Sequence, residues 1–310
     1  MRARHVWLLA LLSGIWGASY LLIKYAIRDL APPVVVFGRT ALAAVALLAV
    51  ILLQGGEARA ALADLRRRPG SAFFLGLVAI AAPFLLITYG ERAVPSGLTA
   101  VLIASAPIFI ALFAPHLDRS EVMAPVQWAG LLLGLVGVGL LVGVESIHTV
   151  GAFLGAMAMI GAAACYALSG FVLKGRYPGF PPIVTSLFSI GTAAVLTLPA
   201  AAAQPPTRAP GGLAILSVVI LGLGGTALAF VIYYRLIGEI GYGPSSVVAY
   251  TIPPVSLLYG AALLDESITP AMIGGMALIL AGVFLIARGR ARRPVPAPQV
   301  GAEASSPTRP

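Results

Sequence analysis

The sequence predicts an all-α integral membrane protein with ten transmembrane helices, arranged as two inverted five-helix repeats. Three observations lead to this fold class. The 310 residues are 59% hydrophobic and only 10% charged, whereas an ordinary soluble domain carries about 25% charged residues. The chain contains ten apolar runs of about 20 residues each, the length of helix that crosses ~30 Å of hydrocarbon. The second half also repeats features of the first half in the same order, which indicates a duplicated unit.

The apolar runs follow one another along almost the whole chain. Those of the first half cover residues 6–27, 34–53, 71–89, 97–117 and 126–144. Those of the second half cover residues 151–173, 183–203, 213–237, 247–264 and 271–287. We therefore divide the chain into a first five-span repeat at residues 1–147, a second at residues 148–288, and a disordered tail at residues 289–310 that is basic and rich in proline.

The last two runs of each half show the repetition most clearly. A Pro-Ser pair opens the fourth run of each half, at Pro95 and Pro244, proline recurs within the run, and a short acidic loop closes it. In the fifth runs, glycines match at a spacing of 145 residues, namely Gly130 with Gly275 and Gly137 with Gly282. This order of features predicts that the two halves share one fold.

The positive charges of the loops predict how the chain is oriented. With a cytoplasmic N-terminus, fourteen Lys and Arg residues fall in inside segments and only Arg28, Arg92 and Arg208 fall in outside loops. Both termini of this multi-pass protein are therefore expected on the cytoplasmic side of the inner (plasma) membrane. Ser19 recurs as Ser169 after an odd number of spans, so the second repeat enters the membrane from the opposite side. Inverted repeats of this kind are typical of secondary transporters, whose sites lie between the halves.

These features together resemble a known family of carriers. The run from Trp16 to Lys24, Arg39 in the second span, the run around Pro107 with its acidic end, and the stretch 250–266 resemble the EamA-type carriers of the drug/metabolite transporter superfamily. The resemblance covers residues 5–288. It implies a central cavity lined by spans one to four and six to nine, with spans five and ten at the periphery. Characterised members that the chain resembles export amino acids or related metabolites from bacteria.

The expected function is secondary transport, by alternating access, of a small metabolite out of the cell. Amino acids and related neutral or zwitterionic compounds are the first choice of substrate, and metabolite uptake or drug efflux by the same fold are the alternatives. An integral-membrane enzyme needs acidic pairs or a His-carboxylate pair at one membrane face. The acidic groups at 118–121 and 265–266 are expected at opposite faces, and no span carries the polar stripe of a channel. We expect no enzyme activity, no cofactor and no metal.

Candidate substrate-binding residues are aromatic and hydroxyl side chains on faces that are expected to meet. Trp16 and Tyr20 share a helical face of the first span, and Phe230 and Tyr233 lie on the eighth span. A packing role between helices or at the lipid headgroups is the alternative for such aromatic residues. The predicted set is Trp16, Tyr20, Ser105, Tyr166, Ser169, Thr226, Phe230, Tyr233, Tyr250 and Thr251. Together these side chains predict a cavity without a fixed charge.

Five further residues are candidates for gates or hinges. Lys24 and Arg39 lie within about two turns of a span end, where long side chains reach the interface, and they are suited to an outer gate or to attracting a carboxylate. Structural anchoring is the alternative. Pro107, Pro253 and Pro254 each remove a backbone hydrogen bond from a span, and a simple packing kink is the alternative to a hinge. No carboxylate is expected deep in a span, which argues against proton antiport at a membrane-embedded glutamate.

The expected partners are a small-molecule substrate and the lipid bilayer. Nucleic acid is not expected as a partner, because the arginines lie at the ends of apolar runs and not in patches interleaved with exposed aromatic residues. Small residues four apart, such as Gly130 and Gly134 in the fifth span, favour close helix packing. A homodimer formed through the fifth span is the alternative use of this pattern.

Overall fold

In the computed structural model, the chain is a bundle of helices. The structure describes residues 3–54, 56, 69–117, 125–142, 149–176, 181–241, 245 and 248–291, and within them every regular element is helical. Among these residues, seven helices are long and apolar enough to cross a membrane, and three more stretches, at Pro125–Leu141, Val248–Leu264 and Pro270–Ile286, are shorter apolar helices. The chain is therefore an all-α membrane protein. Most of the tail expected at residues 289–310, and the acidic group at 118–121, lie outside the described residues.

The helices of the first half begin and end close to the expected positions. They are α1 (Ala3–Ala26), α2 (Pro32–Gln54), the run of α4 (Pro69–Gly76), η1 (Leu77–Ala81) and α5 (Ala82–Gly90), the pair α6 (Ser96–Ile103) and α7 (Ala106–Leu117), and α8 (Pro125–Leu141). Proline begins three of these helices, where its missing N–H costs nothing and its fixed φ suits the first turn. The segment η1 has π-helical geometry, which widens the third span next to Pro83.

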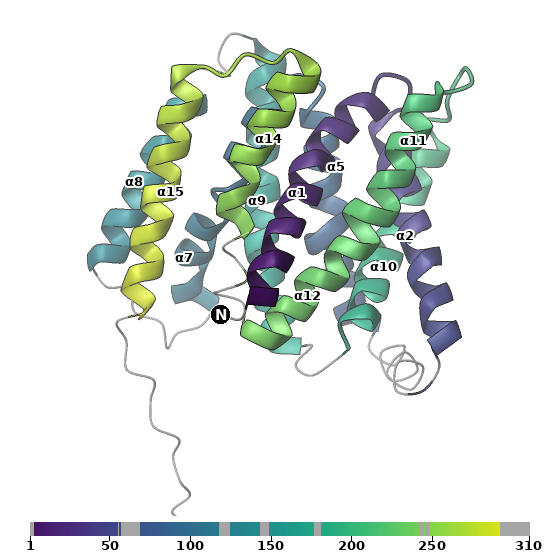
Figure 1. The fold of residues 1–310 in the computed structure, drawn as a ribbon, viewed down its shortest axis with the longest axis horizontal. Coiled ribbons are helices and arrows are strands. Elements are labelled where there is room, and N and C mark those ends of the chain that lie inside the picture. Colours follow the sequence, from purple (N-terminus) through teal and green to yellow (C-terminus); the bar gives the residue numbers. More distant parts are fainter. Residues whose placement is uncertain are drawn as a thin grey trace, which may run out of the picture.

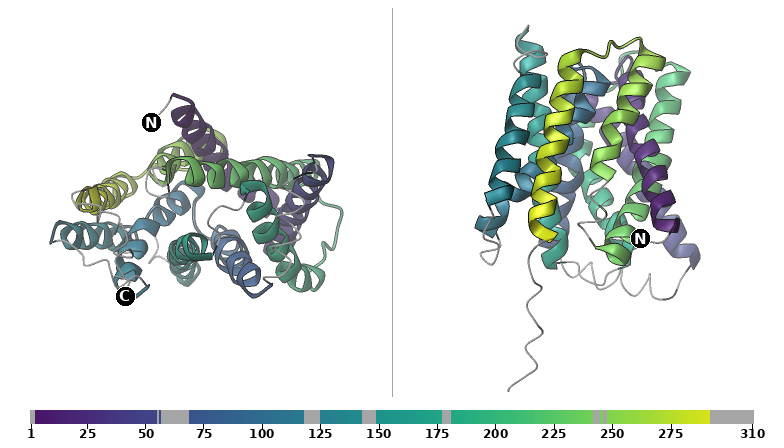
Figure 2. Two further views of the ribbon diagram at one scale, coloured as in Figure 1. Left: turned by 90° about the horizontal axis from the view of Figure 1, so that it is seen from below. Right: turned by 60° about the vertical axis from the view of Figure 1, so that its left-hand side comes forward.

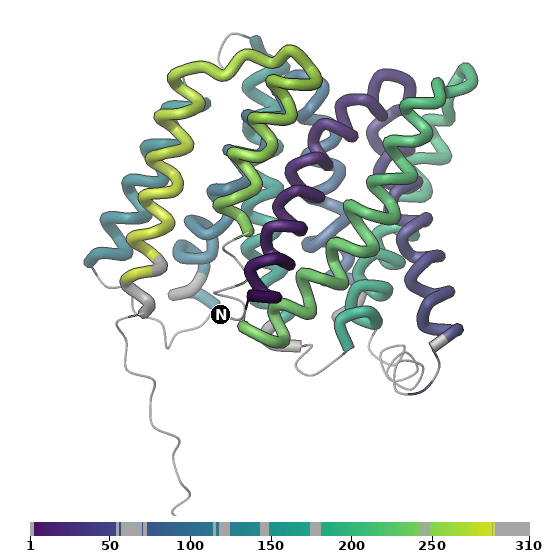
Figure 3. The backbone as a smooth tube through the Cα atoms, viewed as in Figure 1, coloured from purple at the N-terminus to yellow at the C-terminus, as the bar shows by residue number. Residues whose placement is uncertain are grey.

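The second half continues the same bundle (Figure 1). Its helices are α9 (Val150–Arg176), α10 (Pro182–Ala202), α11 (Gly212–Ile220), η3 (Leu221–Leu228), α12 (Ala229–Ile240), α14 (Val248–Leu264) and α15 (Pro270–Ala291). The elements α11, η3 and α12 form one continuous helix that crosses the bundle at a slant, as the tube in Figure 3 shows. Its middle segment, η3, is π-helical. Such bulges often occur at functional sites.

Helices α8 and α15 form a pair at one side of the bundle (Figure 2). Their backbones approach closely because glycines face each other. A Cβ on Gly282 would lie 2.5 Å from the carbonyl oxygen of Gly130, and a Cβ on Gly137 would lie 2.9 Å from that of Gly275. Glycine thus permits van der Waals contact between main chains, which is one of the forces that drive helix association in lipid.

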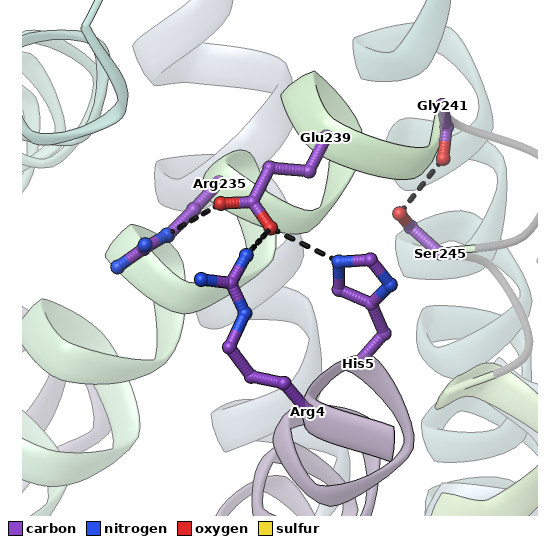
Figure 4. Close-up of polar contacts among 6 residues, drawn as sticks. All are labelled: Arg4, His5, Arg235, Glu239, Gly241 and Ser245. Carbon is purple, nitrogen blue, oxygen red and sulfur yellow. Dashed lines mark hydrogen bonds and ion pairs between the residues drawn. The ribbon is translucent and has the colours of Figure 1, made fainter. Parts of the chain in front are cut away.

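Ion pairs join α1 to α12 at the end of the bundle that holds the N-terminus, called here the N-terminal end. The Glu239 carboxylate accepts hydrogen bonds from Arg4 and, at 2.8 Å, from Arg235, and it lies 3.2 Å from His5 Nε2 (Figure 4). Arg235 therefore lies beside an acidic partner on its own helix. The cluster links the two helix ends, but it is partly exposed, and exposed ion pairs contribute little to stability.

The opposite end of the bundle, called here the far end, is closed by a carboxylate at a helix N-terminus. Glu266, after α14, accepts hydrogen bonds from Ser96 N and Ser96 Oγ, both at 2.8 Å, and from Gly97 N at 3.1 Å. A carboxylate in this position satisfies free N–H groups and complements the helix dipole. Gly260 is needed beside it, because a Cβ there would lie 2.5 Å from Glu266 Oε2. Glu266 therefore ties the second half to α6 of the first.

Candidate functional site

A cavity of about 160 Å³ lies inside the bundle. On this measure one water molecule needs ~10–15 Å³, so the cavity has room for roughly ten waters or one small metabolite. It is lined by residues of α1, α2, η1, α5, α6, α7, α9, α12 and α14 and by one residue of α4. Within the described part of the chain, the peripheral helices α8 and α15 contribute no lining residue, and neither does α10, which the resemblance placed at the cavity. Leu173 and Val248 extend the lining toward the N-terminal end.

Aromatic side chains from α1, α5 and α12 form one wall of the cavity. The ring of Trp16 meets Phe230 edge to face at a centroid distance of 5.7 Å and Tyr233 at 5.1 Å. Phe230 in turn contacts Phe84 and Tyr234. Edge-to-face pairs of this kind are worth about 0.5–1.5 kcal/mol beyond their buried area, so the wall is a packed cluster that holds its shape. It presents flat apolar surface to a solute.

Arg39 places a fixed positive charge in this aromatic cavity. The residue is only 3% exposed, its Nε donates to Thr226 Oγ1 at 3.0 Å, and its guanidinium carbon lies 4.1 Å from the centre of the Phe84 ring. Among the described residues, its two Nη groups have no hydrogen-bond acceptor. The guanidinium is thus fixed by its Nε hydrogen bond and by stacking on the Phe84 ring. Its two Nη groups remain free to donate hydrogen bonds to a carboxylate.

The π-helical segment η3 explains how Arg39 is held. The hydroxyl of Thr226 donates to the carbonyl of Leu221, five residues earlier, at 2.7 Å. Its oxygen can then accept from Arg39. A Cβ on Gly222 would lie 3.1 Å from the Arg39 carbonyl oxygen, so glycine allows η3 and α2 to pack closely. The same segment offers the Gly225 carbonyl to Trp16 Nε1, at 3.2 Å. Thus η3 orients both Arg39 and Trp16.

Six of the ten predicted substrate-binding residues meet at the cavity: Trp16, Tyr20, Tyr166, Ser169, Phe230 and Tyr233. The other four lie outside its lining. Ser105 is fully buried in the turn between α6 and α7 and donates to the Leu102 carbonyl, and Thr226 lies behind Arg39. Tyr250 packs against the core of the bundle, and Thr251 is exposed, with its hydroxyl hydrogen-bonded to Ser13.

The five predicted gating or hinge residues occupy different positions. Arg39 and Pro107 line the cavity, and Pro107 lies just after the break between α6 and α7. Lys24 is one turn beyond Tyr20 toward the far end, where its Nζ donates to the carbonyl oxygen of Glu91 at 2.6 Å. Pro253 and Pro254 lie inside the continuous helix α14, the first buried and the second exposed.

Sequence reasoning missed three residues of the site region. Phe84 and Tyr234 line the cavity, and Tyr234 lies four residues after Phe230, a spacing that signals a shared helical face. The third, Glu91, lies in the turn after α5 and is fully buried. The expectation of an uncharged lining was likewise wrong, since Arg39 lies in the wall. Arg39 was counted as near a span end, but the neighbouring η3 holds its side chain inward.

A helical membrane bundle with a small internal cavity and a fixed charge is the arrangement expected of a membrane transporter. Comparison with known proteins shows the family. The model of the EamA-like transporter family matches residues 4–143 and again residues 153–288. The chain belongs to the EamA-like transporter family.

Related proteins align over almost their whole length. An uncharacterised transporter of Archaeoglobus fulgidus is 30% identical, with 91% of this chain and 98% of the relative covered. A protein of Streptantibioticus cattleyicolor named "Probable terminal-alkyne amino-acid exporter" is 29% identical, with 92% and 94% covered. One solved crystal structure aligns with a TM-score of 0.67 over 94% of this chain and 100% of that one, at 21% identity. The last likeness concerns the fold alone.

Proposed function

We propose that this transporter moves small metabolites that combine a carboxylate with an apolar part, amino acids first, and that it works by alternating access. The observation that carries the proposal is the free edge of the Arg39 guanidinium, which faces a cavity walled by Trp16, Phe84 and Phe230. A buried cation whose donors are only partly satisfied is costly, and Arg39 has an acceptor for Nε but none among the described residues for its two Nη groups. A substrate carboxylate satisfies it, while the aromatic wall receives the apolar part.

Alternating access requires two halves that exchange conformations, and we propose ten spans in two inverted repeats for this purpose. Two observations support the repeats. The family model matches the chain twice, with one match on each side of the expected boundary at 147/148. In addition, Gly130 contacts Gly282 while Gly137 contacts Gly275. The repeat equivalent of Gly130 is Gly275 and that of Gly137 is Gly282, so the two contacts are equivalent when the halves are interchanged. Pairs of equivalent contacts of this kind are typical of surfaces related by a two-fold axis.

We propose an inner-membrane location with both termini in the cytoplasm. The excess of Lys and Arg in the loops at the N-terminal end supports this orientation. A related protein of Escherichia coli, 27% identical, carries the name "Uncharacterized inner membrane transporter YedA". In this orientation the lining at Leu173 and Val248 lies toward the cytoplasm, while Glu266 closes the outer end. The name of the Streptantibioticus relative supports export as the direction of transport.

Replacing Trp16 with alanine tests the aromatic wall. The change removes the edge-to-face contacts with Phe230 and Tyr233 and the hydrogen bond to Gly225. Two such ring pairs are together worth about 1–3 kcal/mol, and the wall that would hold the substrate loses its shape without them. We therefore expect efflux of labelled phenylalanine from proteoliposomes to slow by roughly 5- to 100-fold.

Trp7→Ala is the matched control. Trp7 lies on the same helix and is 74% exposed on the outside of the bundle, so its removal should leave efflux at the wild-type rate. Size-exclusion chromatography checks that both variants are folded. An unchanged rate in folded Trp16→Ala would remove this residue from the substrate site.

A further inference from the structure

Glu91 is a buried carboxylate that takes no part in the proposed substrate site. It lies in the turn after α5, is 0% exposed, and neither Oε1 nor Oε2 has a hydrogen-bond partner among the described residues. An ionised carboxylate in such a place costs far more free energy than a neutral one. A buried carboxylate of this kind needs a bound cation or proton that neutralises its charge.

The surroundings of Glu91 exclude water and bring charges close. On one side, α9 packs tightly against the turn, since a Cβ on Gly90 would lie 2.9 Å from the Gly155 carbonyl oxygen. On another side, the Lys24 ammonium donates to the Glu91 main-chain carbonyl at 2.6 Å. The ionisable side chains that interact electrostatically with Glu91 are Lys24 and Tyr20 of α1, Arg39 of α2, and Glu266 after α14, and Tyr166 of α9 interacts in turn with Tyr20.

Three occupants are conceivable: a metal cation, the ammonium group of a substrate, and a proton. The Lys24 ammonium repels any second cation at this position, and no group of three His, Cys, Asp or Glu residues within the described part of the chain is placed to hold a metal. Glu91 is also absent from the cavity lining, so a substrate bound at Arg39 does not reach it. A proton is small enough, and it removes the charge.

The hydrogen bonding of Lys24 agrees with a neutral carboxyl group. An ammonium beside an ionised carboxylate normally donates to it, because such charge-assisted bonds are about twice as strong as neutral ones. Here the ammonium donates to the main chain of Glu91, and the described residues provide no donor to the carboxylate oxygens.

We propose that Glu91 is a proton-binding site of the carrier, which holds a proton while the far end is closed and releases it when that end opens to water. The step is an acid–base equilibrium: a proton from water forms an O–H bond to one carboxylate oxygen and returns to water on opening. A role of this proton in driving transport rests on the proposed function. The binding of the proton to Glu91 is independent of that function.

Burial and the neighbouring charges each shift the pKa of Glu91 in a definite direction. Burial raises the pKa of Glu91 well above its ordinary value, Lys24 and Arg39 lower it, and Glu266 raises it. A raised pKa means that the buried group keeps its proton at a pH where exposed carboxylates are ionised. Opening the far end removes the burial and so returns the pKa toward the ordinary range near 4.3.

Infrared difference spectroscopy of the purified, lipid-reconstituted protein tests the site directly. Wild type should show the C=O band of a protonated carboxyl group that persists to a pH well above the ordinary glutamate range. Glu91→Gln, which copies the shape of the neutral acid, should lose that band. A band that stays in Glu91→Gln, or one that titrates together with the exposed carboxylates, would overturn the proposal.

Two neighbouring substitutions should move the midpoint of this band in opposite directions. Lys24→Met removes a charge that favours the ionised form, so the midpoint should rise. Glu266→Gln removes a charge that favours the neutral form, so the midpoint should fall. Asp265→Asn is the matched control, because Asp265 is exposed and its positive φ of 55° suits asparagine. Equal midpoints in all four proteins would contradict the site.

These readouts need no substrate, so they separate this proposal from the proposed function. If the band behaves as expected and no amino acid is transported, the proton site stands and the substrate assignment fails. If amino acids are transported and Glu91 shows no such band, the carrier stands and the proton site fails.

Discussion

Replacing Arg39 with glutamine is expected to weaken the binding of amino acids by about 10- to 100-fold. Hydrogen bonds to a charged group contribute about 1.5–3 kcal/mol, and each 1.4 kcal/mol corresponds to a factor of ten. Equilibrium binding of labelled phenylalanine to the purified protein measures the loss. Phenethylamine, which lacks the carboxylate, should bind wild type and Arg39→Gln equally weakly, because it has no group for the guanidinium to recognise.

Two controls separate recognition from folding in this experiment. Arg28→Gln removes an exposed arginine that stacks on Tyr25, and it should bind phenylalanine like wild type. Arg39→Lys keeps the charge but loses the planar fork, so its affinity should fall between those of wild type and Arg39→Gln. Wild-type affinity in a folded Arg39→Gln variant would mean that the carboxylate binds elsewhere.

Replacing Gly282 with leucine is expected to produce the largest loss of stability. The new Cβ would lie 2.5 Å from the Gly130 carbonyl oxygen and 2.7 Å from the Gly134 nitrogen. Overpacking typically costs about 1–3 kcal/mol. The upper part of that range applies here, because main-chain atoms cannot rotate away as a side chain can. Thermal unfolding followed by fluorescence-detected size exclusion should therefore show a clearly lower midpoint, as α15 is forced away from α8.

Gly139→Leu is the matched control for this substitution. Gly139 lies on α8 as well, but it is exposed and nothing lies within 4 Å of the Cβ position. This variant should unfold at the wild-type temperature or slightly above it, because leucine favours the helical state more than glycine does. Equal destabilisation by both substitutions would show that the loss arises from glycine replacement in general and not from the packing of α8 against α15.

The positions of the helices could be predicted from the sequence, because span length and hydrophobicity are local properties. Helix boundaries in the structure lie within a few residues of the expected ones, as for α2 and α10. The face of α1 that carries Trp16 and Tyr20 was also predictable from helical periodicity. These inferences needed only the spacing of apolar and aromatic residues along one helix.

The charged groups of the site could not be predicted in the same way, since their roles depend on other helices. Arg39 is turned into the cavity by Thr226, which lies 187 positions later in the chain. Glu91 has the sequence context of an ordinary turn, and its burial comes with tertiary contacts such as those of Lys24 and of α9 against α5. The π-helical geometry of η3, which allows Thr226 to serve Arg39, has no signature beyond its glycines. Tertiary contacts decide all three.

Efflux from proteoliposomes loaded with a mixture of labelled amino acids tests the central claim, that the Arg39 cavity carries small carboxylates across the membrane. Neutral and aromatic amino acids should leave faster than from protein-free vesicles, and the Arg39→Gln variant should abolish the difference. The corresponding amines without a carboxylate should leave at the protein-free rate. Folded wild-type protein that releases no amino acid above that rate, or that releases amines equally well, would contradict the account.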